Sequence, residues 1–142
     1  MITPTSNAAA LAGRAVLVTG GARRVGAEIA RTLHAAGAQL AVHYRNSTAE
    51  AEALVAQLNS ARSRSAIGIQ ANLLDTSQLS RLVETLLAAF GRLDVLVNNA
   101  STFYPTRIGA ITEAHWNDLL GTNLKAPLFL SQAAAPALAA TR

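Results

Sequence analysis

Short apolar runs alternate with amphipathic segments along the chain, and this alternation limits the possible fold more than any other feature. The predicted strands are 15–18, 39–44, 66–70 and 93–97. The predicted helices are 25–36, 47–60, 76–90 and a fourth that starts near 113. Strands that alternate with helices in this way form a parallel sheet, whose right-handed crossovers place helices on both faces. The pattern therefore predicts a doubly wound α/β fold.

Residues with strong positional preferences mark several of the predicted helix ends. Gly37 and Gly91 follow the first and third helices, where a residue in the left-handed conformation commonly ends a helix. Ser47, with Glu50 three residues later, has the spacing of a capping box at the start of the second helix. Thr112 can cap the fourth helix. These signals agree with the boundaries that the apolar pattern predicts.

The first strand runs into a glycine-rich turn, Thr-Gly-Gly-Ala-Arg-Arg-Val-Gly at 19–26, which opens the first helix. Backbone N–H groups of such a turn can approach a pyrophosphate, and the helix N-terminus adds a partial positive charge. A plain tight turn is the alternative interpretation, but the strand before it and the helix after it favour a dinucleotide site. We therefore expect a Rossmann-type dinucleotide-binding domain over 13–142, preceded by a flexible leader at 1–12.

The end of the second strand indicates which dinucleotide binds. Enzymes that use NAD place an acidic residue there, roughly 20 residues after the glycine turn, to accept hydrogen bonds from the ribose hydroxyls. This chain has Arg45 near that position, within the segment His-Tyr-Arg-Asn-Ser at 43–47. A carboxylate would repel a 2′-phosphate, whereas Arg45 and an arginine of the turn could bind it. NADPH is therefore the predicted cofactor; the alternative is that Arg45 is a solvated loop residue.

Composition argues against several other classes of protein. Apolar residues make up 51% of the chain and charged residues 14%, which suits a globular domain rather than a disordered one. The chain has no cysteine, and its three histidines are not at metal-ligand spacing, so no metal site is expected. The net charge of +4 comes from dispersed arginines, which argues against nucleic acid as a partner. Signal-peptide and membrane-spanning patterns are missing from the sequence, and a cytoplasmic location fits the lack of cysteine.

Three motifs together resemble the short-chain dehydrogenase/reductase family, from about Arg14 to the end of the chain. The motifs are the Thr19-Gly20 turn, Asn98-Asn99-Ala100 after the fourth strand, and Asn123 in the following helix. Within that family, the segments 24–26, 43–51 and 98–105 look most like the pteridine reductases. Asn72 departs from the family pattern, which usually has Asp at this position near the adenine; an amide can still accept and donate hydrogen bonds there.

The resemblance implies a cofactor site and an adjoining substrate site. The residues carried over to the cofactor site are Gly20, Arg23, Arg24, Val25, Gly26, Tyr44, Arg45, Asn46, Ser47, Asn72, Leu73, Asn99, Ala100 and Ser101. The substrate residues are Ser101, Phe103 and Tyr104, with the ring of Phe103 stacking a flat pterin. Ordinary loop packing is the alternative role for Phe103.

Asn123 is the one catalytic residue that the resemblance implies within this chain, where its main-chain carbonyl would hold a water of the proton relay. The residues themselves point the same way. Pro127 has no N–H to donate to that carbonyl, so the helix is expected to kink and leave the carbonyl free on the cofactor side. A tolerated proline, with water on the carbonyl, is the alternative.

The family's catalytic Tyr, and the Lys three or four residues after it, have no match here. Neither Tyr44 nor Tyr104 is followed by a Lys at that spacing. We therefore expect the sheet to be truncated after the helix that follows the fourth strand, and the 142-residue chain to be inactive on its own. The apolar strand at 93–97 would then be an open edge that aggregates or pairs with another segment.

For the parent protein, the prediction is an NADPH-dependent reductase that passes hydride to a small pterin-like molecule. The resemblance also implies a homo-oligomer, most simply a tetramer. One alternative is a reductase of 3-oxoacyl thioesters or other carbonyl compounds within the same family. The other is a non-catalytic dinucleotide-binding module, which a reading frame that continues into Tyr-x-x-x-Lys would exclude.

Overall fold

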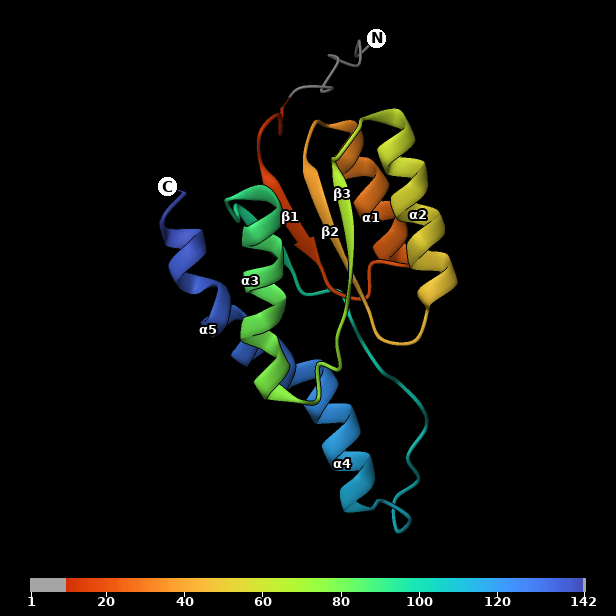
Figure 1. The fold of residues 1–142 in the computed structure, drawn as a ribbon. Coiled ribbons are helices and arrows are strands. Elements are labelled where there is room, and N and C mark those ends of the chain that lie inside the picture. Colours follow the sequence, from red (N-terminus) through yellow and green to blue (C-terminus); the bar gives the residue numbers. More distant parts are fainter. Residues whose placement is uncertain (1–9, 142) are drawn as a thin grey trace, which may run out of the picture.

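The structure, a computed structural model, describes residues 10–141 and contains a four-stranded parallel sheet. The strands are β1 (Ala15–Val18), β2 (Gln39–Tyr44), β3 (Ala66–Gln70) and β4 (Val95–Val97). Their order is β3-β2-β1-β4, of which Figure 1 shows the part β3-β2-β1. The strand β1 therefore pairs with both β2 and β4. The direction in which strands are added reverses between β1 and β4. In parallel sheets of this kind, ligands bind at the carboxyl ends of the strands beside such a switch point.

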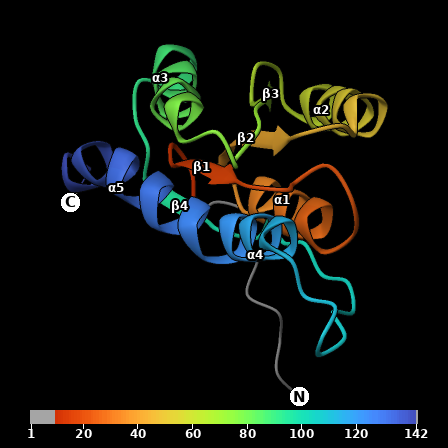
Figure 2. The same ribbon diagram turned by 90° about the horizontal axis from the view of Figure 1, so that it is seen from below.

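Helices cover both faces of the sheet. They are α1 (Arg24–Ala35), α2 (Thr48–Ala61), α3 (Leu79–Phe90), α4 (Glu113–Leu120) and α5 (Ala126–Ala139). A 3₁₀ turn, η1 (Thr76–Gln78), precedes α3, and a π-helical turn, η2 (Gly121–Lys125), joins α4 to α5. α1 and α2 pack on one face, while α3 and α5 pack on the other (Figure 2). The predicted doubly wound, Rossmann-type fold is confirmed.

The strand β1 lies at the centre of both hydrophobic cores. Ala15 and Leu17 pack in the core under α3 and α5, whereas Val16 and Val18 pack in the core under α1 and α2. All four side chains are fully buried. A strand covered on both faces needs an uninterrupted apolar sequence, and this is why the run Ala-Val-Leu-Val predicts its position so well.

The starts of two helices differ from the sequence pattern. Ser47 precedes α2, but its side chain makes no capping hydrogen bond, so the predicted capping box does not form. The carboxylate of Glu50, the expected partner in that box, lies 3.7 Å from the guanidinium of Arg23 instead. The third helix begins as the turn η1, where the carboxylate of Asp75 accepts the N–H of Ser77.

The other three signals are confirmed. Gly37 and Gly91 adopt positive φ angles of 104° and 73° at the ends of α1 and α3. Thr112 caps α4, and its hydroxyl accepts the N–H of His115 while the His115 ring accepts the N–H of Thr112.

The strand β4 is shorter than predicted, because Asp94 takes over the hydrogen bonding at its start. The carboxylate of Asp94 accepts the N–H of Ala15 at 2.8 Å, in place of a main-chain acceptor. Arg92 and Arg14 also donate to it, at 2.6 and 2.8 Å. The bond from Arg92, together with those from Ala15 and Arg14, holds the pKa of this buried carboxyl well below its usual range. Asp94 therefore joins the start of β4 to the start of β1.

The described domain begins before the predicted boundary at residue 13. The N–H of Leu11 donates to the carbonyl of Ala36 at 2.8 Å, and the side chain packs against the core under α1 and α2. Residues 10–12 therefore belong to the domain, because Leu11 covers the end of α1. The rest of the predicted leader, residues 1–9, lies outside the described residues. Within 10–141, no helix has both the length and the apolar character needed to cross a membrane.

The helix α4 extends away from the sheet, at the lower end of Figure 1. It has no buried residue, and the segment that leads to it from β4, residues 98–112, has no regular secondary structure. Large apolar side chains in and around it are exposed, including Trp116 and Ile108. This region contrasts with the fully covered β1.

Candidate functional site

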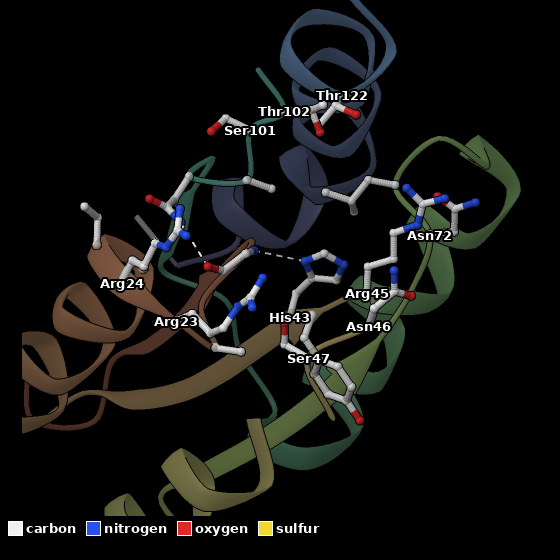
Figure 3. A pocket seen from close by; sticks show the side chains of 18 of the residues that line it. Arg23, Arg24, His43, Arg45, Asn46, Ser47, Asn72, Ser101, Thr102 and Thr122 are labelled. Atoms are coloured by element: carbon white, nitrogen blue, oxygen red, sulfur yellow. Dashed lines mark hydrogen bonds between the residues drawn. The ribbon is translucent and has the colours of Figure 1, made fainter. Parts of the chain in front are cut away.

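A cleft of about 410 Å³ opens at the carboxyl ends of the strands, beside the switch point between β1 and β4 (Figure 3). Its walls are the turn after β1, the end of β2, the loops after β3 and β4, and the turn η2. Every residue predicted to contact the cofactor lines this cleft, from Gly20 through Ser101. The structure thus brings together four segments that are far apart in the sequence. That these residues bind a cofactor remains a prediction.

Close packing makes two glycines of the turn necessary. Gly20 has a φ of 59°, and a Cβ atom there would lie 3.0 Å from the Cα of Ala100. A Cβ on Gly26 would lie 2.2 Å from the carbonyl oxygen of Gly20 and 2.6 Å from the side-chain nitrogen Nδ2 of Asn99. Only glycine therefore lets α1 start this close to the end of β4.

Hydrogen bonds between Thr19 and Asn99 join the turn to the end of β4. The Thr19 hydroxyl accepts the N–H groups of Asn99 and Ala100, both at 3.0 Å. The amide of Asn99 donates to the carbonyls of Thr19 and Gly20, at 2.9 and 3.1 Å. The side chain of Asn99, a residue predicted to belong to the cofactor site, thus holds the turn.

Three arginines bring positive charge to the cleft: Arg23 and Arg24 from the turn and Arg45 from the end of β2. The lining residues that the structure describes include no Asp or Glu. Arg24 is the first residue of α1, yet it has a φ of 51°, a left-handed conformation that costs a non-glycine residue about 1 kcal/mol. Such strain is concentrated at functional sites, where surrounding contacts maintain it.

The buried ring of His43 forms part of the cleft between the turn and β3. Its Nδ1 accepts the N–H of Gly20 at 3.1 Å (Figure 3). Its Nε2 donates to the carbonyl of Ala71 at 3.0 Å. The residue is 2% exposed. Burial lowers the pKa of His43 below its ordinary value, more than the bond to Ala71 raises it. The imidazole is therefore neutral near pH 7, with its proton on Nε2.

The loop after β3 closes the cleft on the side opposite the turn. The side-chain oxygen of Asn72 accepts the N–H of Leu74 at 3.2 Å, so its amide nitrogen is the group that can donate to a ligand. Leu73 lies next to it and is buried. This arrangement differs from a carboxylate, which can only accept.

The structure places the three predicted substrate residues differently. Ser101 lines the cleft, whereas Phe103 is 89% exposed and is not among the lining residues. Tyr104 points to α4, where its hydroxyl donates to Asp118 at 3.0 Å and its ring meets the edge of His115. Burial, and next the neighbouring carboxylate, raise the pKa of Tyr104. Tyr104 therefore holds the loop rather than facing the cleft.

Asn123 lies in the turn η2 and connects it to the loop after β4. Its side chain accepts the N–H of Thr102 at 3.0 Å and donates to the carbonyl of the same residue at 2.7 Å. The chain accommodates Pro127 with a π-helical turn, and the proline itself lies in the first turn of α5. The expected role of the Asn123 carbonyl stays a prediction.

Sequence reasoning did not single out several residues of the cleft. Of these, His43 makes bonds that shape the turn, and Ala22, Leu74, Thr102 and Thr122 line the cleft as well. A histidine in an otherwise apolar strand was a signal for His43, because a polar group buried in a sheet needs partners on both sides.

Comparison with known proteins places this geometry in a family. The family model for short chain dehydrogenases matches residues 14–142. Pteridine reductase 1 of Leishmania tarentolae is 40% identical, with 89% of this chain and 54% of the relative covered. A 3-oxoacyl-[acyl-carrier-protein] reductase of Staphylococcus aureus is 36% identical, with 87% and 50% covered. The chain thus spans about half the length of the curated relatives it matches.

Solved structures give the same result. A metagenomic short-chain oxidoreductase in complex with NADP superposes with a TM-score of 0.86 at 34% identity, over 94% of this chain and 60% of that one. A blue fluorescent protein from a metagenomic library, in complex with NADPH, has a TM-score of 0.85 at 38% identity, over 90% and 52%. The family model covers nearly all of the described residues, and the strand order and glycine turn agree with it. The chain belongs to the short chain dehydrogenase family.

Proposed function

We propose that the cleft binds NADPH and that this chain forms the cofactor-binding part of a short-chain reductase. The observation that carries the proposal is the charge of the cleft: Arg23, Arg24 and Arg45 line it, and no described lining residue is acidic. An acid at the end of β2 would accept hydrogen bonds from the ribose of NADH, whereas arginines favour a 2′-phosphate. The solved complexes of similar proteins with NADP and NADPH support the same choice.

Each wall of the cleft has a distinct part in this proposal. The start of α1 presents backbone N–H groups and the positive end of its dipole to the pyrophosphate. Arg45 and Arg23 bind the 2′-phosphate, helped by Ser47, whose hydroxyl is not used as a helix cap. Asn72 and Leu73 contact the adenine, and Asn99, Ala100 and Ser101 line the path toward the nicotinamide.

NADPH would supply the hydride, and the protein would supply binding and orientation. Asn123 fixes the loop after β4 through its two bonds to Thr102. We propose in addition that its main-chain carbonyl, to which Pro127 cannot donate, holds a water for proton transfer.

For the substrate, we favour a pterin over a 3-oxoacyl thioester. Phe103 is exposed and directly follows Thr102, which lines the cleft, so its aromatic ring suits stacking against a flat heterocycle bound beside Ser101. The relative at 40% identity is a pteridine reductase, and the one at 36% is a 3-oxoacyl reductase, so both classes occur among similar proteins. Faster reduction of dihydrobiopterin than of acetoacetyl thioesters, at the full encoded length of the protein, would favour the pterin; the reverse order would favour the thioester.

We propose that the protein associates with copies of itself through α4, η2 and the start of α5. Trp116, Leu124 and Leu128 recur at multiples of four residues along these elements, and each is more than 60% exposed. A run of large apolar side chains on one stretch of surface marks an interaction site. Sedimentation of the protein and of a Leu124→Asp, Leu128→Asp variant tests this, because the variant should sediment as a smaller species.

Titration of the protein with each cofactor tests the main proposal. NADPH should bind at least tenfold more tightly than NADH, and Arg45→Asp should reverse the order. Arg81→Asp, on the outer side of α3, is the matched control and should leave both affinities unchanged. Preference for NADH in the unmodified protein would contradict the proposal.

A further inference from the structure

We propose that His43 is a positioning residue for the cofactor: its neutral ring holds the glycine turn in the shape that binds a dinucleotide, and protonation of the ring releases the turn. The inference rests on the proposed function of the cleft. It goes further, because it assigns the shape of the turn to one side chain and predicts how binding depends on pH.

The hydrogen bonds of His43 account for both glycine N–H groups at the start of the turn. Gly20 donates to the ring, and Gly21 donates to the main-chain carbonyl of His43 at 2.9 Å. These two groups point into the protein and are not available to a ligand. The donors left for a pyrophosphate are those that follow, from Ala22 into the start of α1. Their position relative to β2 is therefore set by His43 through its side chain and its main chain together.

The ring also fixes the far wall of the cleft. Its Nε2 holds the carbonyl of Ala71, immediately before Asn72 and Leu73. One buried side chain thus sets the separation of the turn, which would hold the pyrophosphate, from the loop that would hold the adenine. A displacement of about 1 Å between such groups is enough to weaken binding strongly.

Protonation is incompatible with this arrangement. A charged imidazole carries a proton on both nitrogens, so Nδ1 would face the N–H of Gly20 as a second donor. Among the described residues, no Asp or Glu lines the cleft beside the ring to stabilise the charge. The charged groups that share the cleft are Arg23 and Arg24 of the turn and Arg45 of β2. The walls from β3, β4 and η2 contribute Asn72, Leu73, Leu74, Asn99, Ala100, Ser101, Thr102 and Thr122, all uncharged, and Asp75 is bonded to Ser77 and Gln78.

The sign of the pH effect follows from these contacts. Arginines stay charged at all relevant pH values, and His43 is the one described residue lining the cleft whose side chain has an ordinary pKa near neutrality. Its pKa is lowered from 6.5 in the folded protein. Affinity should therefore be constant above pH 6.5 and fall by up to tenfold per pH unit below the pKa of the ring.

Calorimetric titration with NADH from pH 5 to 8 tests the inference. NADH is the probe because the 2′-phosphate of NADPH itself titrates near pH 6. His43→Asn places an amide oxygen near the position of Nδ1, so it keeps an acceptor for Gly20 that does not titrate. It loses the donor to Ala71, so we expect weaker binding than that of the unmodified protein at pH 7.5, but a flat pH profile. His43→Gln keeps a donor for Ala71 but loses the Gly20 acceptor, so it should bind at least tenfold more weakly at every pH.

His34→Gln is the matched control. His34 is also buried and also has a pKa lowered by burial, but it bonds to Ser65, which precedes β3 at the opposite end of the sheet. This variant should keep the pH profile of the unmodified protein, whatever it does to the unfolding temperature. Circular dichroism at each pH confirms that every variant is folded where binding is measured.

Two results would overturn the inference while leaving the proposed function intact: a His43→Asn profile that still falls below pH 6.5, or His43→Gln binding as tightly as the unmodified protein. Should the variants not fold, nitrogen-15 NMR of the unmodified protein decides instead. We expect a neutral ring protonated on Nε2 that titrates together with the loss of affinity; a proton on Nδ1, or titration at a different pH, would refute the idea. A protein that binds neither NADH nor NADPH at any pH contradicts the proposed function itself.

Discussion

The two rims of the cleft are built in opposite ways. The turn after β1 is fixed by the buried Thr19 and His43 and the half-buried Asn99, each of which makes two or more hydrogen bonds there. The loop after β4 is attached by side-chain bonds at Thr102 and Tyr104, and its Phe103 is 89% exposed. The turn after β1 is held by packing and many hydrogen bonds, whereas the loop after β4 is held by a few side-chain contacts.

This difference indicates that the turn serves cofactor binding and the loop serves substrate selectivity in the proposed reductase. A cofactor of fixed shape favours a rigid, preorganised rim, because little conformational freedom is then lost on binding. A loop with exposed apolar side chains can reach different conformations and can bind different substrates. Mutations in the turn should therefore affect folding and cofactor together, whereas mutations in the loop should affect the substrate alone.

The largest effect is expected at the rigid rim. Gly26→Ala would place a methyl group 2.2 Å from the carbonyl oxygen of Gly20, so α1 must move away from the turn. We expect a loss of roughly 3 kcal/mol in the free energy of unfolding and no measurable binding of NADPH. Denaturant unfolding and fluorescence titration measure the two effects. Gly68→Ala, where a Cβ would meet no atom closer than 3.4 Å, is the control and should bind normally.

A somewhat smaller effect is expected at the base of the sheet, where Asp94 joins β4 to β1. Asp94→Asn should lower the free energy of unfolding by about 2 kcal/mol at pH 7, because hydrogen bonds from charged donors to a carboxylate are lost. The pKa of Asp94 is lowered on folding, so its carboxylate stabilises the protein above about pH 4 and less as the pH falls further. Unfolding curves from pH 3 to 7 should be flatter for the variant. An unchanged free energy of unfolding at pH 7 would contradict the role of Asp94 in joining β4 to β1.

In the loop after β4, the expected change is in substrate binding. Phe103→Ala should raise KM for dihydrobiopterin about tenfold at the full encoded length of the protein, through lost stacking and lost apolar contact. Ile108→Ala is the control, because Ile108 is equally exposed at 93% in the same loop. Stability should be the same in both variants. An equal rise in KM for both would mean that the loop acts as a whole, and not through one ring.

The smallest effect is expected at Arg24, where the cost of backbone strain and the contribution to NADPH binding can be measured separately. Arg24→Gly should raise the free energy of unfolding by about 1 kcal/mol, because glycine adopts a φ of 51° without strain, and should also weaken NADPH binding. Arg64→Gly is a matched control, since Arg64 has a φ of 54° but does not line the cleft. It should stabilise the protein by a similar amount with no change in affinity. Equal affinity in both variants would remove Arg24 from the cofactor site.

The sequence predicts the turn after β1 well and the loop after β4 poorly, for a physical reason. Strand and helix positions around β1 follow from local patterns, and even the glycine ends of α1 and α3 are as expected. The bonds of Tyr104 to Asp118 and of Asn123 to Thr102 join residues 14 and 21 positions apart, across a segment without periodicity. The capping box at Ser47 does not form, and the carboxylate of Glu50 lies near Arg23, outside its own helix. Such choices depend on tertiary contacts that no local pattern records.

The π-helical turn η2 makes this part of the chain sensitive to length rather than to side-chain chemistry. It holds one more residue per turn than an α-helix requires, so removing a single residue between Gly121 and Lys125 would restore an ordinary helix. Each residue of an α-helix turns the chain by about 100°. With α5 anchored in the core by Ala126 and Leu130, the deletion would rotate α4 by that angle and carry Asn123 away from Thr102. The extra residue thus fixes the rotation of α4 relative to α5. It keeps α4 directed toward the loop after β4 while α5 keeps its buried face on the sheet.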